Sequence, residues 1–317
     1  MLTYTLKRLL ATLPVLFVVS VAIFLIIHIT PGSPAATILG MEATSAQIEA
    51  FNEEMGYNRP LIEQYTSWVS GIVQGDFGDS LFMNQTVLGA VSQHIGPTLS
   101  LALLSQLIAI VLAIPLGILA AHKRGTILDT MLMSFSLFGM AVPNFLLALI
   151  LMLILGVNLG WLPVAGYAPL SSGLINHLTT LLLPALSLGA IQAALITRMT
   201  RSAMLDVLSL HYMRAARSKG LKERTLLIKH AFRNAFLPIL TVIGQTFGTL
   251  VTGAVVIETI FNIPGLGQLI INSIVRRDYV VIQGVVLIVT LIYLFINLVI
   301  DLLYGVVDPR VRLDRKE

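Results

Sequence analysis

The chain lacks cysteine and is poor in charge. None of its 317 residues is cysteine, and only 11% are Asp, Glu, Lys or Arg. Without cysteine there is no disulfide, no thiol nucleophile and no Cys-based metal or iron–sulfur site. A soluble chain carries about 25% charged residues, so the charges here are too few to coat two soluble domains. The composition excludes an ordinary cytosolic enzyme, a disordered chain and a small disulfide scaffold.

The sequence also lacks the motifs of catalysis. It contains no G-x-x-x-x-G-K-[ST], so the chain is not predicted to hydrolyse ATP. H-E-x-x-H and G-x-S-x-G are absent, and none of the six histidines is paired at i,i+4. We therefore expect no catalytic residue, no metal site and no cofactor in this chain.

Apolar residues make up 56% of the chain, and the charge-free stretches among them are the strongest signal. A helix needs about 20 apolar residues to cross the roughly 30 Å hydrocarbon layer of a bilayer. Buried soluble helices would be shorter and amphipathic. The longest stretch is divided by the Gly- and Pro-rich segment Gly156–Asn176. Six transmembrane helices are predicted, at Leu9–Ile29, Leu99–Ala121, Met131–Leu155, Leu178–Thr197, Phe236–Ile257 and Val281–Leu303.

The basic residues predict the orientation. With both termini in the cytoplasm, 17 of the 20 Lys and Arg residues lie on the cytoplasmic side, as the positive-inside rule requires. The net charge of +4 is then a topology signal for a protein of the lipid bilayer, and no nucleic acid is expected as a partner. Among the exceptions, Arg276 and Arg277 stand beside Asp278. They form either a paired, hydrated turn or a surface for an acidic partner outside.

About 67 residues between the first two spans form an outer segment with seven acids. Thr44 and Gln47 predict a capping box, and Pro60 suits the start of a second short helix. The apolar stripe of this second helix includes Tyr65 and Trp68. The two helices could bind a partner, lie on the membrane or pack on the bundle, and the pattern leaves these alternatives open.

A cytoplasmic segment, Arg198–Arg233, holds nine basic residues and has a helical pattern. Tyr212, Ala215 and Ala216 share a face with Leu205 and Leu208, and Gly220 predicts a left-handed stop before a second helical run. A solvated basic loop would satisfy the positive-inside rule. The small residues at its centre favour a short helix on which a cytosolic protein docks.

Two further features lie on the spans themselves. Gly244, Gly248 and Gly253 form a strip of small residues, which permits close helix contact either within the bundle or beside a pathway. Glu258 and Asp301 are the acids at span ends, and we expect structural pairing for both, with loop amides after Ile263 as the partners of Glu258.

The cytoplasmic segment resembles a known sequence. Its residues 212–221 and 230–238, YMRAARSKGL and HAFRNAFLP, are similar to the EAA loop of ABC-importer permeases, in the variant of the oligopeptide/dipeptide/nickel permease family. Arg214 stands where Glu is usual, and Leu237-Pro238 comes five residues late, as is typical of the peptide branch. Further matches, in order along nearly the whole chain, are TPGSP at 30–34, NRPL at 58–61, QGDFG at 74–78, PNF at 143–145, IETIF at 257–261, PGLG at 264–267, RDY at 277–279 and DPR at 308–310.

The resemblance implies a permease subunit of an importer, the first of two paralogous permeases. Its expected partners are the sibling permease, two cytosolic ATPases that bind ATP and Mg, and an extracytoplasmic substrate-binding protein. In this reading the docking residues are Tyr212, Ala215, Ala216, Lys219, Gly220 and Leu221. The glycine strip Gly244, Gly248 and Gly253 would lie near the pathway, and Tyr65, Trp68, Arg276 and Arg277 would face the binding protein.

The implied mechanism is alternating access driven by the ATPases, in the cytoplasmic membrane of a bacterium. Di- or oligopeptides are the favoured substrate, and nickel or a metal chelate is the alternative. An ion-coupled secondary transporter and a non-transporting scaffold are the competing classes. The former predicts charges at mid-membrane, which the charge-free spans lack.

The predicted fold is an all-α integral membrane protein with six transmembrane helices and, by resemblance, the type I ABC-importer permease architecture. Residues 1–94 hold the first span and the helical outer segment, and residues 95–304 hold the transmembrane core. The coupling loop covers 198–234, and 305–317 form a cytoplasmic tail.

Overall fold

The structure is a computed structural model that describes residues 2–29, 39, 43–54, 56–80 and 82–307. Across these residues the regular elements are helices, apart from one isolated bridge between Asp79 and Thr86. The quoted stretches 30–34 and 308–310 lie outside the described residues, as does most of the predicted tail. The all-α prediction is confirmed.

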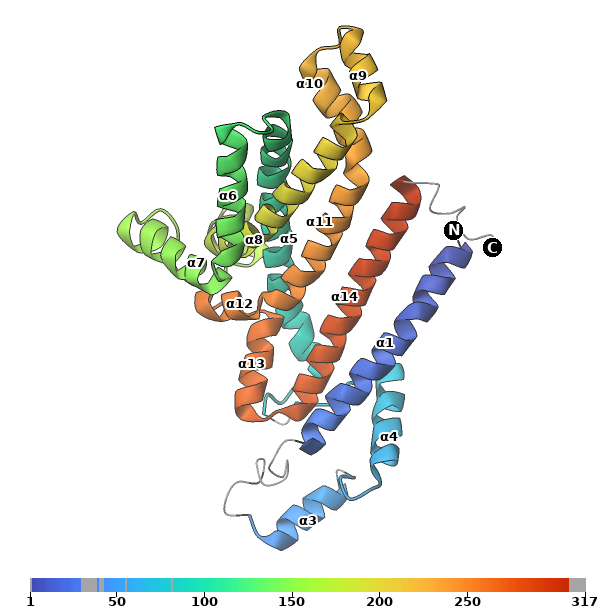
Figure 1. Cartoon of the computed structure of the whole chain (residues 1–317). Coiled ribbons are helices and arrows are strands. Elements are labelled where there is room, and N and C mark those ends of the chain that lie inside the picture. Colours follow the sequence, from blue (N-terminus) through green and yellow to red (C-terminus); the bar gives the residue numbers. More distant parts are fainter. Residues whose placement is uncertain (1, 30–38, 40–42, 55, 81, 308–317) are drawn as a thin grey trace.

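Among the described residues, five helices are long and apolar enough to cross a membrane. They run roughly along one direction in Figure 1, and the start of α1 lies near the end of α14. Their bounds are α1 Leu2–Ile29, α5 Val87–His122, α8 Leu174–Leu208, α14 Tyr279–Val307, and a continuous helix over Glu223–Gly253 made of α10 Glu223–Thr225, a π-helical turn Leu226–Phe232 and α11 Arg233–Gly253.

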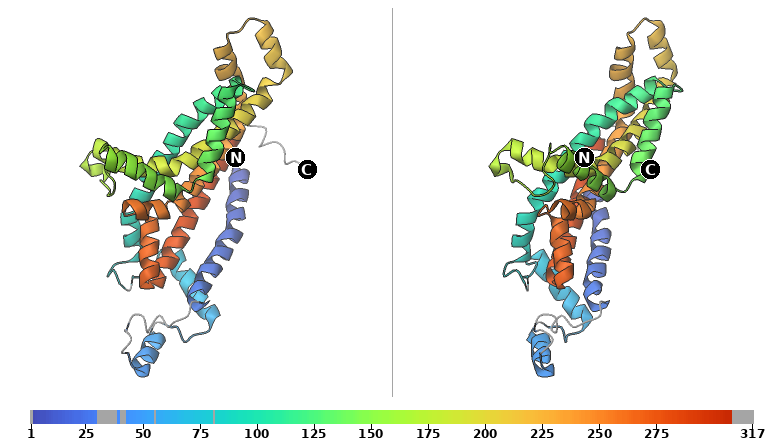
Figure 2. Two further views of the ribbon diagram at one scale, coloured as in Figure 1. Left: turned by 60° about the vertical axis from the view of Figure 1, so that its left-hand side comes forward. Right: turned by 90° about the vertical axis from the view of Figure 1, so that its left-hand side faces the viewer.

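The third predicted span, Met131–Leu155, is bent and consists of two helices. Helix α6 (Ile127–Ala141) and the helix beginning with α7 (Asn144–Leu151) meet at 102°. Pro143 separates them, and the residue before it, Val142, is extended, as a residue before proline prefers. A π-helical turn, Met152–Asn158, continues α7. Helix α7 and this turn together project sideways from the bundle in every view (Figure 2).

The fifth predicted span also ends differently from the prediction. Helix α11 stops at Gly253, and the short helix α12 (Val255–Phe261) follows it. Helix α12 then meets α13 (Leu266–Arg276) at 87°, through a turn in which Asn262 is left-handed. The straight helices and the bent pair α6–α7 account for the six predicted spans, whereas the second bent pair, α12–α13, was not predicted.

Helices α5 and α8 pack closely because small residues lie between them. A Cβ added to Gly189 would lie 2.7 Å from the backbone oxygen of Ser105, and one added to Gly117 would lie 2.5 Å from Thr200. Such contacts between small residues let helices approach in a membrane, where dispersion replaces the hydrophobic effect as the main attraction. The α5–α8 pair forms the centre of the bundle.

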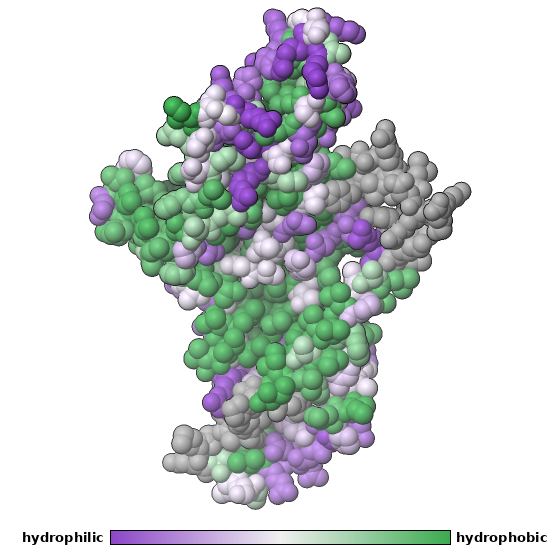
Figure 3. Space-filling model, viewed as in Figure 1, coloured by the Kyte–Doolittle hydropathy of each residue, from purple (hydrophilic) through white to green (hydrophobic). Residues whose placement is uncertain are grey.

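The outer segment contains two short helices, α3 (Ser45–Glu54) and α4 (Leu61–Val73). The predicted capping box is confirmed, since the Thr44 amide donates to Gln47 Oε1 at 2.9 Å and the Gln47 amide donates to Thr44 Oγ1 at 3.3 Å. Apolar residues form a band across the middle of the molecule, with hydrophilic residues at its two ends (Figure 3). The band is the surface expected for a bundle surrounded by lipid.

Candidate functional site

A polar groove runs between α8 and α11, with a volume of about 570 Å³. The contributing residues of each helix fall at spacings of three or four, which places them on one face. They are Gln192, Leu195, Arg198, Met199 and Ser202 from α8, and Val242, Gln245, Thr246 and Thr249 from α11. The groove therefore concentrates amide, hydroxyl and guanidinium groups on one face of a largely apolar bundle.

The amide of Gln192 has a fixed orientation within this groove. Its Nε2 donates to Thr249 Oγ1 at 3.3 Å, and the Thr249 hydroxyl donates in turn to the carbonyl oxygen of Thr246 at 2.7 Å. Because that hydroxyl proton is already used, Thr249 acts as the acceptor for Gln192. The Gln192 Oε1 atom is then left buried with no hydrogen-bond partner, in a residue that is only 9% exposed. An unmet buried acceptor is costly, so it is uncommon in folded proteins.

A second amide supports the groove from behind. Gln106 on α5 donates from Nε2 to Thr246 Oγ1 and to the carbonyl oxygen of Ile243, both at 3.2 Å. Both Gln106 and Thr246 are buried. These bonds hold the polar face of α11 at a fixed rotation against α5.

Two arginines near the end of α8 differ sharply in their surroundings. Arg201 is half-buried and forms a bidentate ion pair with Asp129 of α6, at 2.6 and 2.7 Å. Arg198, which lines the groove, is exposed, and its recorded polar contact is to the sulfur of Met140 at 3.4 Å. No acid in the described part of the chain lies within ion-pair distance of Arg198.

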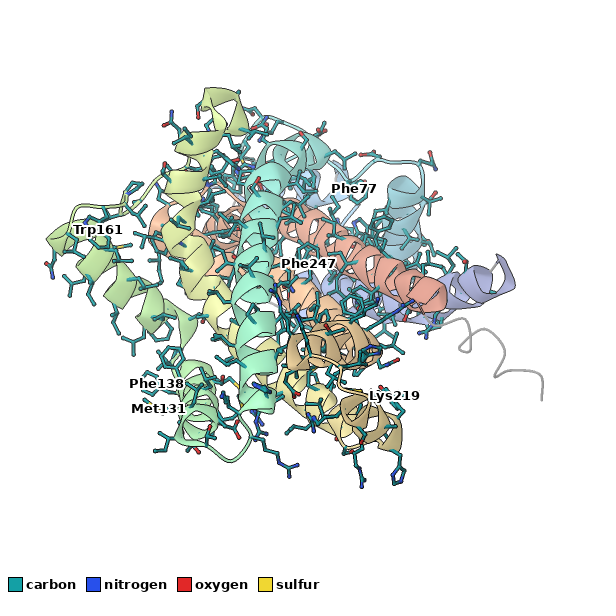
Figure 4. The ribbon with its side chains drawn as sticks, turned by 90° about the horizontal axis from the view of Figure 1, so that it is seen from above. Phe77, Met131, Phe138, Trp161, Lys219 and Phe247 are labelled. Carbon is teal, nitrogen blue, oxygen red and sulfur yellow. The ribbon has the colours of Figure 1, made fainter. Side chains whose placement is uncertain are left out.

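The same two helices carry a protruding elbow, residues 209–222, at one end of the molecule (Figure 1). Its helix is α9, His211–Ser218, and Gly220 adopts the predicted left-handed conformation with φ of 74°. Lys219, which follows α9, is labelled on this elbow in Figure 4. Large apolar side chains stand exposed on it: Leu210, Tyr212 and Leu221.

The elbow is firmly attached to the bundle. Met213 of α9 is 3% exposed and belongs to an apolar cluster with residues of α5, α8 and α11. Arg217 pairs with Glu223 at 2.8 Å, and His122 at the end of α5 lies 3.7 Å from the same carboxylate. Tyr212 accepts a hydrogen bond from Asn234. The elbow is therefore packed against or bonded to all three helices.

The structure refines the predicted face of the docking helix. Helix α8 ends at Leu208, so Leu205 and Leu208 do not share one continuous helix with Tyr212 as the pattern indicated. Leu210 begins the new helix in an extended conformation, which turns its axis. As a result Ala216 packs partly against the apolar cluster, whereas Ala215 is exposed.

Two of the predicted pathway residues contact another helix. A Cβ added to Gly244 would lie 2.7 Å from Ile300, and one added to Gly248 would lie 2.7 Å from Tyr293, both on α14. Gly253 has no atom within 4 Å of such a position. Gly244 and Gly248 therefore pack against α14, whereas Gly253 makes no such contact, and a position of these glycines beside the pathway stays a prediction. The groove residues were missed, although the spacing of Gln245, Thr246 and Thr249 within a charge-free span was a usable signal.

The predicted pairings of the span-end acids are confirmed. Glu258 accepts hydrogen bonds from the amides of Gly267 and Gln268, at 2.8 and 3.1 Å. These amides follow Ile263 as expected, but they belong to the first turn of α13 and not to a loop. Asp301 pairs with Arg8 at 3.0 Å. Both acids thus connect elements of the fold: Glu258 joins α12 to α13, and Asp301 joins α14 to α1.

Tyr65 and Trp68 contact α1. Both rings lie against Phe24, with centroids 5.4 and 6.1 Å away, and the Tyr65 hydroxyl is 2.8 Å from Ser20 Oγ. Packing on the bundle thus accounts for the half-buried apolar stripe of α4, and a contact of these rings with a binding protein stays a prediction.

At the far end of the bundle Arg276 and Arg277 are exposed, and Asp278 is 1% exposed. Asp278 accepts its hydrogen bonds from Ser80 and from the amide of Val281. No ion pair of either arginine with Asp278 is found in the described part of the chain, and a contact of these arginines with an acidic partner outside stays a prediction. Burial, together with the charge of Asp278, raises the pKa of Tyr57.

An apolar band, a polar groove between two spans and a protruding elbow on the same two helices define a multi-pass membrane transport subunit. The chain belongs to the family of binding-protein-dependent transport system inner membrane components, whose two parts match residues 113–313 and 1–102.

Named relatives span the whole chain. It is 40% identical over 309 residues to the "probable peptide ABC transporter permease protein y4tP" of Sinorhizobium fredii, covering 98% of this chain and 99% of that one. It is also 40% identical over 312 residues to the glutathione transport system permease protein GsiC of Escherichia coli K12, with the same coverage. Family membership favours the importer over the ion-coupled transporter and the scaffold.

A solved structure shares the fold. The chain superposes on a subunit of the inward-facing MetNI methionine ABC transporter with a TM-score of 0.59 and 18% identity, over 69% of this chain and 96% of that one. The predicted type I importer permease architecture is confirmed.

Proposed function

We propose that this chain is a permease subunit of an ATP-driven importer of di- or oligopeptides, and that the groove between α8 and α11 forms one wall of the pathway. A single observation carries the proposal: the groove and the elbow are parts of the same helix pair. Ser202, at the end of the groove, precedes the elbow by only seven residues, about 10 Å along a helix. A force on the elbow therefore acts directly on the groove.

The lining of the groove suits a peptide. Amide and hydroxyl side chains form hydrogen bonds with peptide groups, and Gln192, Gln245 and Thr249 supply them. The volume falls within the range of about 300–1,000 Å³ typical of small-molecule sites. The printed names of the two relatives, one a peptide permease and the other a glutathione permease, agree with this substrate class.

The elbow is the proposed docking site for one of two cytosolic ATPases, which bind ATP and Mg. Tyr212, Ala215, Lys219, Gly220 and Leu221 are exposed and form its outer surface. Ala216 lies at its inner edge. Closure of the ATPase pair would move the elbow, and its anchoring to α5, α8 and α11 would tip the bundle between inward- and outward-open arrangements.

The sibling permease is the proposed partner across the open side of the groove, so that two chains enclose the pathway. The binding protein would approach the opposite end, where Arg276 and Arg277 are exposed without an acidic partner in the described part of the chain. With the elbow and both termini in the cytoplasm, this end faces outward in a bacterial inner membrane.

The docking proposal is tested with the assembled complex. Ala215→Arg places a long charged side chain on the exposed face of α9 and is expected to abolish co-purification of the ATPases while leaving membrane insertion intact. His211→Arg, also exposed on α9, is the matched control and should retain them. Wild-type recovery of the ATPases with Ala215→Arg would overturn the proposal for the elbow.

The pathway is tested by labelling, which is clean because the chain has no cysteine. In the complex, Gln245→Cys and Thr249→Cys should react with a membrane-impermeant thiol reagent, and added peptide should slow the reaction. Val111→Cys, on an exposed apolar face of α5, is the control and should stay unlabelled. Labelling of Val111→Cys alone would place the aqueous path elsewhere.

A further inference from the structure

The groove has an unbalanced charge. Arg198 is the one charged residue among its described lining residues, and none of the others is acidic. Three residues further along α8, Arg201 has its charge matched by Asp129. The two side chains share a helix and a chemistry, so the difference lies in their surroundings. Arg198 presents a planar set of donors whose natural complement is a carboxylate.

A second unmatched group lies further along the groove. Gln192 Oε1 is a buried acceptor without a partner. It precedes Arg198 by six residues, which corresponds to about 9 Å along the helix axis. Six residues turn an α-helix through about 600°, so the two side chains leave α8 in directions about 120° apart, and the peptide is assigned to Arg198 alone.

We propose that Arg198 binds the terminal carboxylate of the peptide. This inference rests on the proposed pathway and adds to it a specificity. A free carboxyl terminus is then recognised by the permease itself as well as by the binding protein.

The test compares two forms of one tripeptide, with a free carboxylate and with a carboxyl-terminal amide. Their uptake is measured in proteoliposomes containing the whole complex, with the same binding protein throughout. The ratio of the two uptake rates is compared between variants, which cancels the preference of the binding protein. Arg198→Gln is expected to lower the acid-to-amide ratio about tenfold, the size of one charge-assisted hydrogen bond. Arg198→Lys keeps the charge but loses the planar donor set, so it should lower the ratio by a smaller factor. Lys123→Gln removes an exposed charge outside the groove and should leave the ratio unchanged.

A second measurement avoids the binding protein. In Gln245→Cys, the free-acid peptide should slow thiol labelling at about tenfold lower concentration than the amide, and adding Arg198→Gln should remove this difference. If Arg198→Gln reduces both peptides equally, as an ion pair with the sibling permease would predict, the carboxylate assignment is overturned while the pathway stands. If the wild-type complex takes up neither peptide and neither slows labelling, the proposed function itself fails.

Discussion

The Thr98 hydroxyl donates a hydrogen bond of 2.6 Å to the Glu258 carboxylate and accepts one of 2.8 Å from the amide of Leu266. One side chain on α5 thus connects α12 with the beginning of α13, across 160 residues of sequence. Glu258 is fully buried, and its remaining partners are the amides of Gly267 and Gln268. The sharp α12–α13 bend is held by this network.

Removing the Thr98 hydroxyl should weaken the bend. Thr98→Val leaves the Leu266 amide and one Glu258 oxygen without this partner, and each unsatisfied buried group costs about 1–3 kcal/mol. We expect a lower melting temperature for the detergent-solubilised complex. Thr98→Ser keeps the hydroxyl and serves as the control. Equal melting temperatures for the two variants would show that the network contributes no stability.

Because only one of them contacts α14, Gly244 and Gly253 of α11 should differ in the effect of an alanine substitution on stability. Gly244→Ala forces a methyl group against Ile300 and is expected to destabilise the protein by about 1–3 kcal/mol, as overpacking does. Gly253→Ala meets no atom and should be neutral or slightly stabilising, because alanine favours a helix. Denaturant titration of the purified chain measures the difference, and the same loss for both would contradict this packing.

The ion pair between α6 and α8 predicts a loss on removal of one charge. Asp129→Asn leaves Arg201, which is half-buried, without its partner, and breaking such a pair costs about 3 kcal/mol. Asp206→Asn removes an exposed acid from the same helix as Arg201 and should have little effect. Thermal unfolding compares the two variants. An unchanged melting temperature of Asp129→Asn would show that the ion pair does not help to join these helices.

Substitutions of Arg276 and Arg277 should change the stability of the protein and its response to the binding protein independently. Arg277 ends α13 in a left-handed conformation, φ 56°, which favours glycine. Arg277→Gly should therefore raise stability, by up to about 1 kcal/mol, whereas stimulation of ATPase activity by the binding protein should fall because the charge is lost. Arg276→Gln, without the backbone effect, should lower stimulation alone. Full stimulation of both variants would exclude these arginines from the receptor surface.

The amino-acid pattern was sufficient for the features that depend on local chemistry. Long stretches without charge become membrane helices because apolar side chains are stable in the hydrocarbon layer, where charged ones are not. Gly220 ends a helix because glycine tolerates a left-handed conformation. The capping box of Thr44 and the amide partners of Glu258 follow from short-range hydrogen-bonding rules.

Only the tertiary structure decided which faces meet. Apolar spans are hydrophobic on all sides, so periodicity does not tell a groove from a packing surface, and Gly244 and Gly248 proved to contact α14. The 102° bend at Pro143 lies within a uniformly apolar stretch, so the composition does not tell by how much or in which direction the second helix turns. Arg198 and Arg201 are both arginines of α8, three positions apart in the sequence. Their difference arises because helix rotation brings Asp129 to one of them and leaves the other in the groove.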